Sequence, residues 1–172
     1  MAFSEMFVHK KNPSLYFLVL VLFLLSAAVY TAYFDILLPG FSDGSYRKAV
    51  GEMFIIPSVL LAAGQIFFGG FLLHMCTSAI AKKGDFLRSL SIAAIMAFMF
   101  SLTYVMFPFY GPFYYIVFVL TGPWYALPLE IAYTAATVLA SAYLIRRFYD
   151  IEWKISIFVA AVILGGMTVA AS

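Results

Sequence analysis

The chain has 172 residues, of which 65% are hydrophobic and only 10% are charged. A soluble domain needs about 25% charged residues to cover its surface, so this composition excludes an ordinary soluble globular protein. The net charge of +2 is too small to indicate a nucleic-acid partner. We therefore expect one integral membrane domain, residues 1–172, whose outer surface is solvated largely by lipid.

The apolar segments predict an all-α membrane protein with five transmembrane helices. In chain order their expected ranges are 15–38, 53–76, 86–107, 129–145 and 155–171. Pro39 and Gly40 end the first helix, and residues 39–52 are expected to form a solvated loop. The first apolar run is longer than the about 7–15 residues of a signal-peptide core, which favours a retained span.

Small residues recur at helical spacing in two of these segments. Ser89, Ala93, Ala97 and Ser101 follow one another every four residues in the third predicted helix. Three alanines repeat the pattern in the fourth helix, at positions 132, 136 and 140. Small residues let neighbouring helices approach closely in a membrane, so both stripes predict packing surfaces.

Residues 107–128 do not fit a full crossing. Prolines and glycines interrupt the segment, it carries no charge, and aromatic residues crowd both of its ends. The apolar run inside it, residues 113–121, is much shorter than the about 20 residues that a span requires. We predict an interfacial or re-entrant segment between the third and fourth helices. Its aromatic residues form either an interfacial belt or the lining of a lipid or quinone pocket.

The positions of the basic residues predict the orientation in the membrane. Five spans place eight of the ten Lys and Arg residues on one side, leaving only Arg47 and Lys48 on the other. A sixth crossing at residues 113–121 would divide the basic residues evenly. The positive-inside rule therefore favours five spans, with the N-terminus inside and the C-terminus outside.

This layout resembles the Ypt-interacting protein (Yip) domain family of five-span membrane proteins. The resemblance rests on Asn12-Pro13 before the first helix and on segment 70–90, which contains His74 and the turn Lys83-Gly84-Asp85-Phe86. The stretch from Trp124 through the fourth helix, a short basic turn and a final helix is also similar. The resemblance covers nearly the whole chain through short, loosely spaced motifs.

The resemblance implies a protein that organises membrane partners rather than an enzyme. Eukaryotic members of the family carry a longer cytosolic N-terminal region with an acidic-aromatic motif, and they bind Rab-type GTPases in secretory traffic. Residues 1–14 contain no such motif. The resemblance therefore implies a short, prokaryotic-type member, and it transfers no biochemical role to individual residues.

Three polar residues in the predicted spans are candidates for an ion or proton site. Asp35 and Glu130 lie near the outer ends of their helices, and Gln65 lies in the middle of the second helix. Carboxylates inside a membrane are costly and often functional. Both carboxylates also fit simple interfacial solvation, and Glu130 lies in a first turn, where the helix dipole favours it. We expect Gln65 to hydrogen-bond to a neighbouring helix.

Two further groups of residues lie near the predicted inner side. A basic surface that either contacts anionic lipid headgroups or only sets the topology is formed by Lys82, Lys83, Arg88, Arg146, Arg147 and Lys154. His74 and Cys76 are too few for a metal site, which needs three or four ligands. The single cysteine also excludes an intramolecular disulfide. We predict no metal, no cofactor and no catalytic residue.

The sequence favours a non-enzymatic integral membrane protein that organises lipids or partners, which are other membrane proteins or further copies of itself. The alternatives are a small transporter, a substrate-binding subunit of a transporter, or an auxiliary subunit of a larger membrane complex. A transporter predicts a mid-membrane cavity reached by Asp35, Gln65 or Glu130. The expected location is the plasma membrane in a prokaryote or an endomembrane in a eukaryote.

Overall fold

The computed structural model describes residues 13–37, 44–82, 85–106 and 123–171. All regular structure in these residues is α-helical, in five helices. They are α1 (Pro13–Leu37), α2 (Gly44–Ala81), α3 (Phe86–Met106), α5 (Pro123–Tyr149) and α6 (Trp153–Ala171). The predicted all-helical class is therefore confirmed for this part of the chain. Residues 107–122 of the predicted interfacial segment lie outside the described residues.

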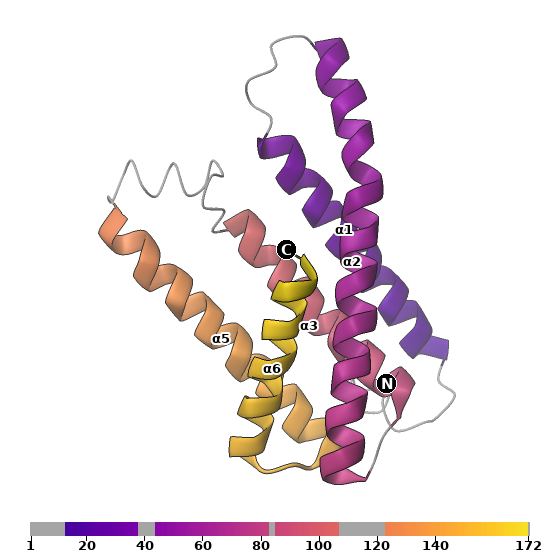
Figure 1. Ribbon diagram of the computed structural model, residues 1–172, viewed down its shortest axis with the longest axis vertical. Coiled ribbons are helices and arrows are strands. Elements are labelled where there is room, and N and C mark those ends of the chain that lie inside the picture. Colours follow the sequence, from indigo (N-terminus) through magenta and orange to yellow (C-terminus); the bar gives the residue numbers. More distant parts are fainter. Residues whose placement is uncertain (1–12, 38–43, 83–84, 107–122, 172) are drawn as a thin grey trace.

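Two of the helices are long and apolar enough to cross a membrane. The qualifying stretches are Ser14–Ala32 in α1, with 19 residues, and Met53–Ile80 in α2, with 28 residues. Shorter apolar stretches occur at Phe86–Leu102 in α3 and Trp153–Thr168 in α6. A helix rises about 1.5 Å per residue, so α2 as a whole is about 57 Å long. Its N-terminal end extends beyond the other helices (Figure 1).

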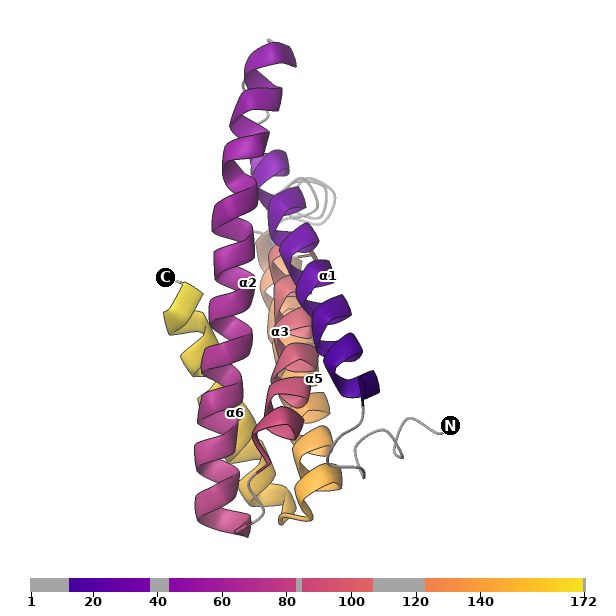
Figure 2. The same cartoon turned by 90° about the vertical axis from the view of Figure 1, so that its right-hand side faces the viewer.

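Helix α3 lies at the centre of the fold. It contacts all four other described helices, while α2 also packs against α1 and α6, and α5 packs against α6 (Figures 1 and 2). The predicted stripe explains this position, because Ser89, Ala93, Ala97 and Ser101 are all fully buried. The alanine stripe of α5 behaves differently: its residues at 132, 136 and 140 are exposed. The expected packing role of the second stripe is therefore wrong within the described structure.

Glycines allow the closest helix contacts. A Cβ built on Gly70 of α2 would lie 2.9 Å from Leu90 Cδ1 and 3.1 Å from Leu90 Cα, on α3. A Cβ on Gly166 of α6 would lie 2.7 Å from Leu72 Cδ1, on α2. At Gly70 the Leu90 backbone would lie closer to the added Cβ than in most real Cβ contacts, so glycine favours the close approach of α2 and α3. At Gly166 the atom in the way is the end of a flexible leucine side chain, which can move aside.

Two helices begin earlier than the sequence predicts. Helix α2 starts at Gly44, inside the predicted loop 39–52, and α5 starts at Pro123, inside the predicted segment 107–128. Pro123 suits the first position of a helix because the amide N–H that it lacks would have no partner there. Pro128 lies inside α5, where it removes one backbone hydrogen bond near the helix start without ending the helix.

Candidate functional site

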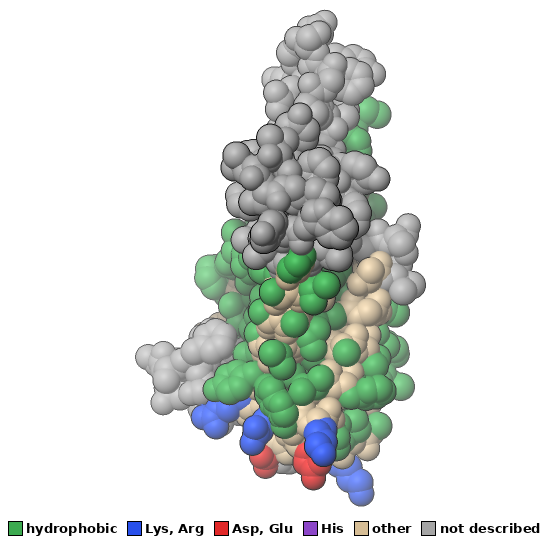
Figure 3. Space-filling model, turned by 90° about the vertical axis from the view of Figure 1, so that its left-hand side faces the viewer, with side chains coloured by type: hydrophobic (Ala, Val, Ile, Leu, Met, Phe, Trp, Pro, Cys, Tyr) green, Lys and Arg blue, Asp and Glu red, His purple; other side chains and the backbone are tan. Residues whose placement is uncertain are grey.

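The basic residues gather where two helix connections meet. Helix α2 ends and α3 begins at the same end of the bundle as the α5–α6 turn (Figure 1). The described basic side chains at this end are those of Lys82, Arg88, Arg146, Arg147 and Lys154. Figure 3 shows Lys and Arg side chains below a broad band of hydrophobic ones. We call these five residues the basic end; Lys83 lies outside the described residues.

Three acidic residues accompany the basic end, and one of them has a structural role. Asp85 precedes α3, and its Oδ1 accepts hydrogen bonds from the backbone N–H groups of Leu87 (3.1 Å) and Arg88 (3.5 Å). This arrangement is an N-cap, which satisfies free helix donors and places the carboxylate at the positive end of the helix dipole. Asp150 and Glu152 lie in the α5–α6 turn and are exposed.

Both connections use an unusual backbone conformation at a polar residue. Lys82 follows α2 with φ of 51°, and Asp150 follows α5 with φ of 55°. The Asp150 N–H donates to the carbonyl of Arg146 (2.9 Å). A left-handed residue of this kind ends a helix tightly. The tight turns hold the exposed charges of Lys82, Arg147 and Lys154 at one end of the bundle.

Arg146 packs on an aromatic ring of the next helix. Its guanidinium carbon lies 5.8 Å from the centre of the Trp153 ring, a cation–π distance. Arg146 is exposed and Trp153 is 36% exposed, so the charge remains accessible to solvent or lipid. The contact orients the Arg146 guanidinium at the basic end.

A buried hydroxyl cluster lies beneath the basic end. The Tyr149 hydroxyl of α5 lies 2.6 Å from Ser89 Oγ of α3 and also interacts with Thr77 of α2. Thr77 Oγ1 donates to the Leu73 carbonyl (2.7 Å). Burial raises the pKa of the Tyr149 hydroxyl above its ordinary value, so this group stays neutral. The cluster joins three helices, and no sequence motif marks Tyr149.

His74 and Cys76 form no ligand set in the structure. The His74 ring meets Phe86 edge-to-face, with ring centres 5.7 Å apart, and Cys76 is a half-buried free thiol. Among the described residues, no group of three or more His, Cys, Asp or Glu side chains could hold a metal ion. His74 and Cys76 are therefore not part of a metal-binding group among the described residues.

Gln65 makes the interhelical hydrogen bond that the sequence predicts. Its Oε1 accepts from the hydroxyl of Tyr30 on α1 at 2.5 Å, and both side chains are fully buried. Its Nε2 has no partner among the described residues. The side chains of Asp35 and Glu130 lie outside the described residues.

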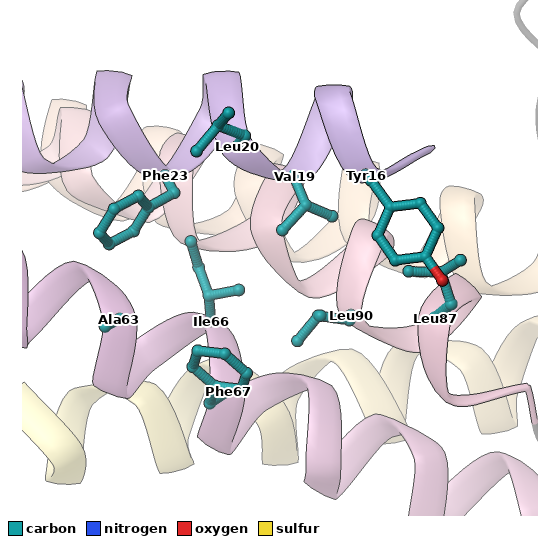
Figure 4. A pocket seen from close by; sticks show the side chains of 9 residues that line it. All are labelled: Tyr16, Val19, Leu20, Phe23, Ala63, Ile66, Phe67, Leu87 and Leu90. Carbon is teal, nitrogen blue, oxygen red and sulfur yellow. The ribbon is translucent and has the colours of Figure 1, made fainter. Parts of the chain in front are cut away.

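An apolar groove that no sequence pattern indicates lies between the first three helices (Figure 4). Its volume is about 240 Å³. It is lined by Tyr16, Val19, Leu20 and Phe23 of α1, by Ala63, Ile66 and Phe67 of α2, and by Leu87 and Leu90 of α3. The four α1 residues fall on one helix face, but this spacing is common to packed helices and does not by itself indicate a groove.

Comparisons with known proteins give no match to a family model, to a curated protein or to a solved structure. The resemblance to the Yip family therefore stays a hypothesis. Function must be inferred from the placement of the basic end, the buried polar residues and the apolar groove.

Proposed function

We propose that the chain is a non-enzymatic integral membrane protein whose basic end binds anionic lipid headgroups and so organises lipids or membrane partners. The surface of the described residues exposes many large apolar side chains, which suits contact with lipid. Its exposed large side chains include Phe17 (68%), Ile56 (68%), Ile131 (60%) and Phe158 (67%), on four different helices. Soluble monomers rarely expose apolar surface of this extent, because contact with water is unfavourable.

The proposed topology has five spans, with the N-terminus inside and the C-terminus outside. Consecutive described helices run in alternating directions, so both basic turns lie on one side (Figure 1). Arg47 and Lys48 lie in the first turns of α2, at its opposite end from Lys82. The positive-inside rule assigns the side with the basic turns to the cytoplasm or its equivalent.

The observation that carries the proposal is the charge balance at the basic end. Five basic residues face three acidic ones there, and Asp85 is already engaged at the start of α3. Each basic residue near an anionic membrane surface contributes about 1 kcal/mol to binding. The resemblance to the Yip family agrees with a scaffold of this kind. It also supports a plasma-membrane location in a prokaryote or an endomembrane location in a eukaryote.

Neutralising the basic end tests this proposal. We expect the variant with Lys82→Gln, Arg147→Gln and Lys154→Gln to lose preference for phosphatidylglycerol, by about fivefold for each charge removed. The matched control changes Arg47 and Lys48 to Gln at the opposite end of α2. The measurement is native mass spectrometry of lipids retained from bilayers of equal phosphatidylglycerol and phosphatidylcholine. Equal losses in both variants would contradict a site at the basic end.

A transporter or transporter subunit is the second candidate, favoured by the unpartnered Nε2 of buried Gln65. The first proposal involves no water-filled path, so it predicts that a Gln65→Cys variant, with Cys76→Ser, resists a charged thiol reagent because position 65 is fully buried. A Lys82→Cys variant in the same background is the positive control, since Lys82 is exposed. Rapid labelling at position 65, measured by mass shift, would instead favour a water-filled path.

A further inference from the structure

We infer that the apolar groove between α1, α2 and α3 holds one acyl chain of a phospholipid whose anionic headgroup lies at the basic end. This inference rests on the proposed function and names the lipid contact more closely. It assigns a ligand class to a groove whose lining does not include Gln65, His74 or the buried hydroxyl cluster. The occupant is a membrane lipid rather than a protein segment.

The groove runs along the direction that a lipid chain takes. Tyr16, Val19, Leu20 and Phe23 occupy one face of α1 over two helical turns (Figure 4). The groove therefore follows the axis of a helix long enough to cross a membrane. Its Tyr16 end lies beside Leu87 in the first turn of α3. Its other end, at Phe23 and Ala63, lies away from Tyr16 and Leu87.

The lining suits a hydrocarbon chain and not a polar ligand. None of the nine lining side chains is charged, and the Tyr16 hydroxyl is their only polar group. The volume of about 240 Å³ is below the about 300 Å³ at which small-molecule sites usually begin. The groove therefore accommodates part of one flexible chain, while the remainder of the lipid stays in the bilayer.

A chain can enter the groove sideways from the bilayer. Tyr16, Leu20 and Phe67 form exposed walls, with 62%, 52% and 59% of their surfaces accessible. Ile66, only 2% exposed, forms part of the buried floor. An aromatic residue with a polar tip, such as Tyr16, is typical of the level where chains meet headgroups. The open side and the position of Tyr16 both match a lipid inserted from the surrounding membrane.

Charge at the Tyr16 end provides the selectivity that the groove alone lacks. Bilayer hydrocarbon is as apolar as leucine, so burial of a chain gives little preference for the groove over the bulk lipid. Exposed Lys82 lies in the turn that precedes α3, and half-buried Arg88 directly follows the lining residue Leu87 in the first turn of that helix. A headgroup held by Lys82 restrains the attached chain beside the groove, as paired anchors do in lipidated proteins.

The test maps where a lipid chain touches the full-length protein. The probe is phosphatidylglycerol with a photoreactive diazirine in one acyl chain, at low mole fraction in phosphatidylcholine bilayers. We expect several-fold more cross-linking at Val19, Leu20 and Phe67 than at Ile131 and Phe158, which are exposed on α5 and α6. Even labelling of both sets would overturn the inference, as would groove residues that the lipid probe does not label.

A variant in which a bulky side chain fills the groove is compared with a variant that carries the same change elsewhere. Ala63→Phe places a ring among the lining side chains, whereas Ala135→Phe adds the same ring to an exposed position of α5. Only the first variant is expected to lose the enriched cross-links. The wild-type cross-linking map decides the inference by itself if Ala63→Phe does not fold.

A phosphatidylcholine probe separates the two proposals. Groove labelling that is equal for both headgroups would overturn the anionic lipid that the inference assigns to the groove, together with the anionic preference in the proposed function. A preference for phosphatidylglycerol without enrichment in the groove would overturn the chain site and leave the headgroup proposal standing.

Discussion

Tyr149→Ala is expected to lower the free energy of unfolding by about 3 kcal/mol, among the largest effects of any single substitution in this chain. Tyr149 is only 1% exposed and is one of the largest fully buried side chains of the described residues. Its truncation leaves a cavity between α2, α3 and α5 and removes the partner of Ser89 Oγ at 2.6 Å. The measurement is the unfolding midpoint in a detergent-to-SDS titration.

Two further variants separate the contribution of burial from that of the hydroxyl group to this loss of stability. Tyr143→Ala removes the same side chain from the same helix at a position that is 59% exposed, so its expected effect is within about 0.5 kcal/mol. Tyr149→Phe keeps the ring and loses the hydroxyl, at an expected cost of about 0.6–1.7 kcal/mol. Equal destabilisation by Tyr143→Ala and Tyr149→Ala would contradict the buried position of Tyr149 beneath the basic end.

The helical fold was predictable because apolar runs and their interruptions are local properties. The position of α3 also follows from its sequence, since four small residues at four-residue spacing create a surface for close packing. The same reasoning was wrong for Ala132, Ala136 and Ala140 of α5, which are exposed. A stripe shows that a helix face can pack closely, but the positions of the neighbouring helices decide whether it does.

The helix starts show a similar limit. Residues 44–52 contain turn-forming residues, yet α2 begins at Gly44. Gly and Ser favour turns by weak local preferences, and a long helix that continues from a packed segment can override them. Pro123 is compatible with both a loop and a first helical turn, so the sequence could not choose between them.

Some features of the candidate sites were also predictable from the sequence, and others were not. The basic end follows from sequence, because two charged turns separated by two helices come to the same side. The bond from Gln65 to another helix was predictable from the cost of an unpaired amide, but its partner Tyr30 was not. The apolar groove depends on gaps between side chains of three helices. No local pattern encodes such a gap, because it arises only when the helices pack.

Gly70→Leu is expected to destabilise the bundle by about 3 kcal/mol, at the upper end of overpacking costs. The first added atom would meet the Leu90 backbone at 3.1 Å, and a backbone cannot move aside as the end of a flexible side chain can. Helices α2 and α3 would have to separate along their contact. That separation would also widen the groove, where Ile66 of α2 and Leu90 of α3 both line the cavity.

Gly64→Leu is the matched control for this effect. It makes the same change in the same helix, where a Cβ would find nothing within 4 Å. We expect a stability within about 0.5 kcal/mol of the wild type, measured by the same SDS titration. Similar unfolding midpoints for the two variants would mean that α2 and α3 do not meet at Gly70. Strong destabilisation by Gly70→Leu but not by Gly64→Leu would establish the close contact between α2 and α3. These two helices form two walls of the groove.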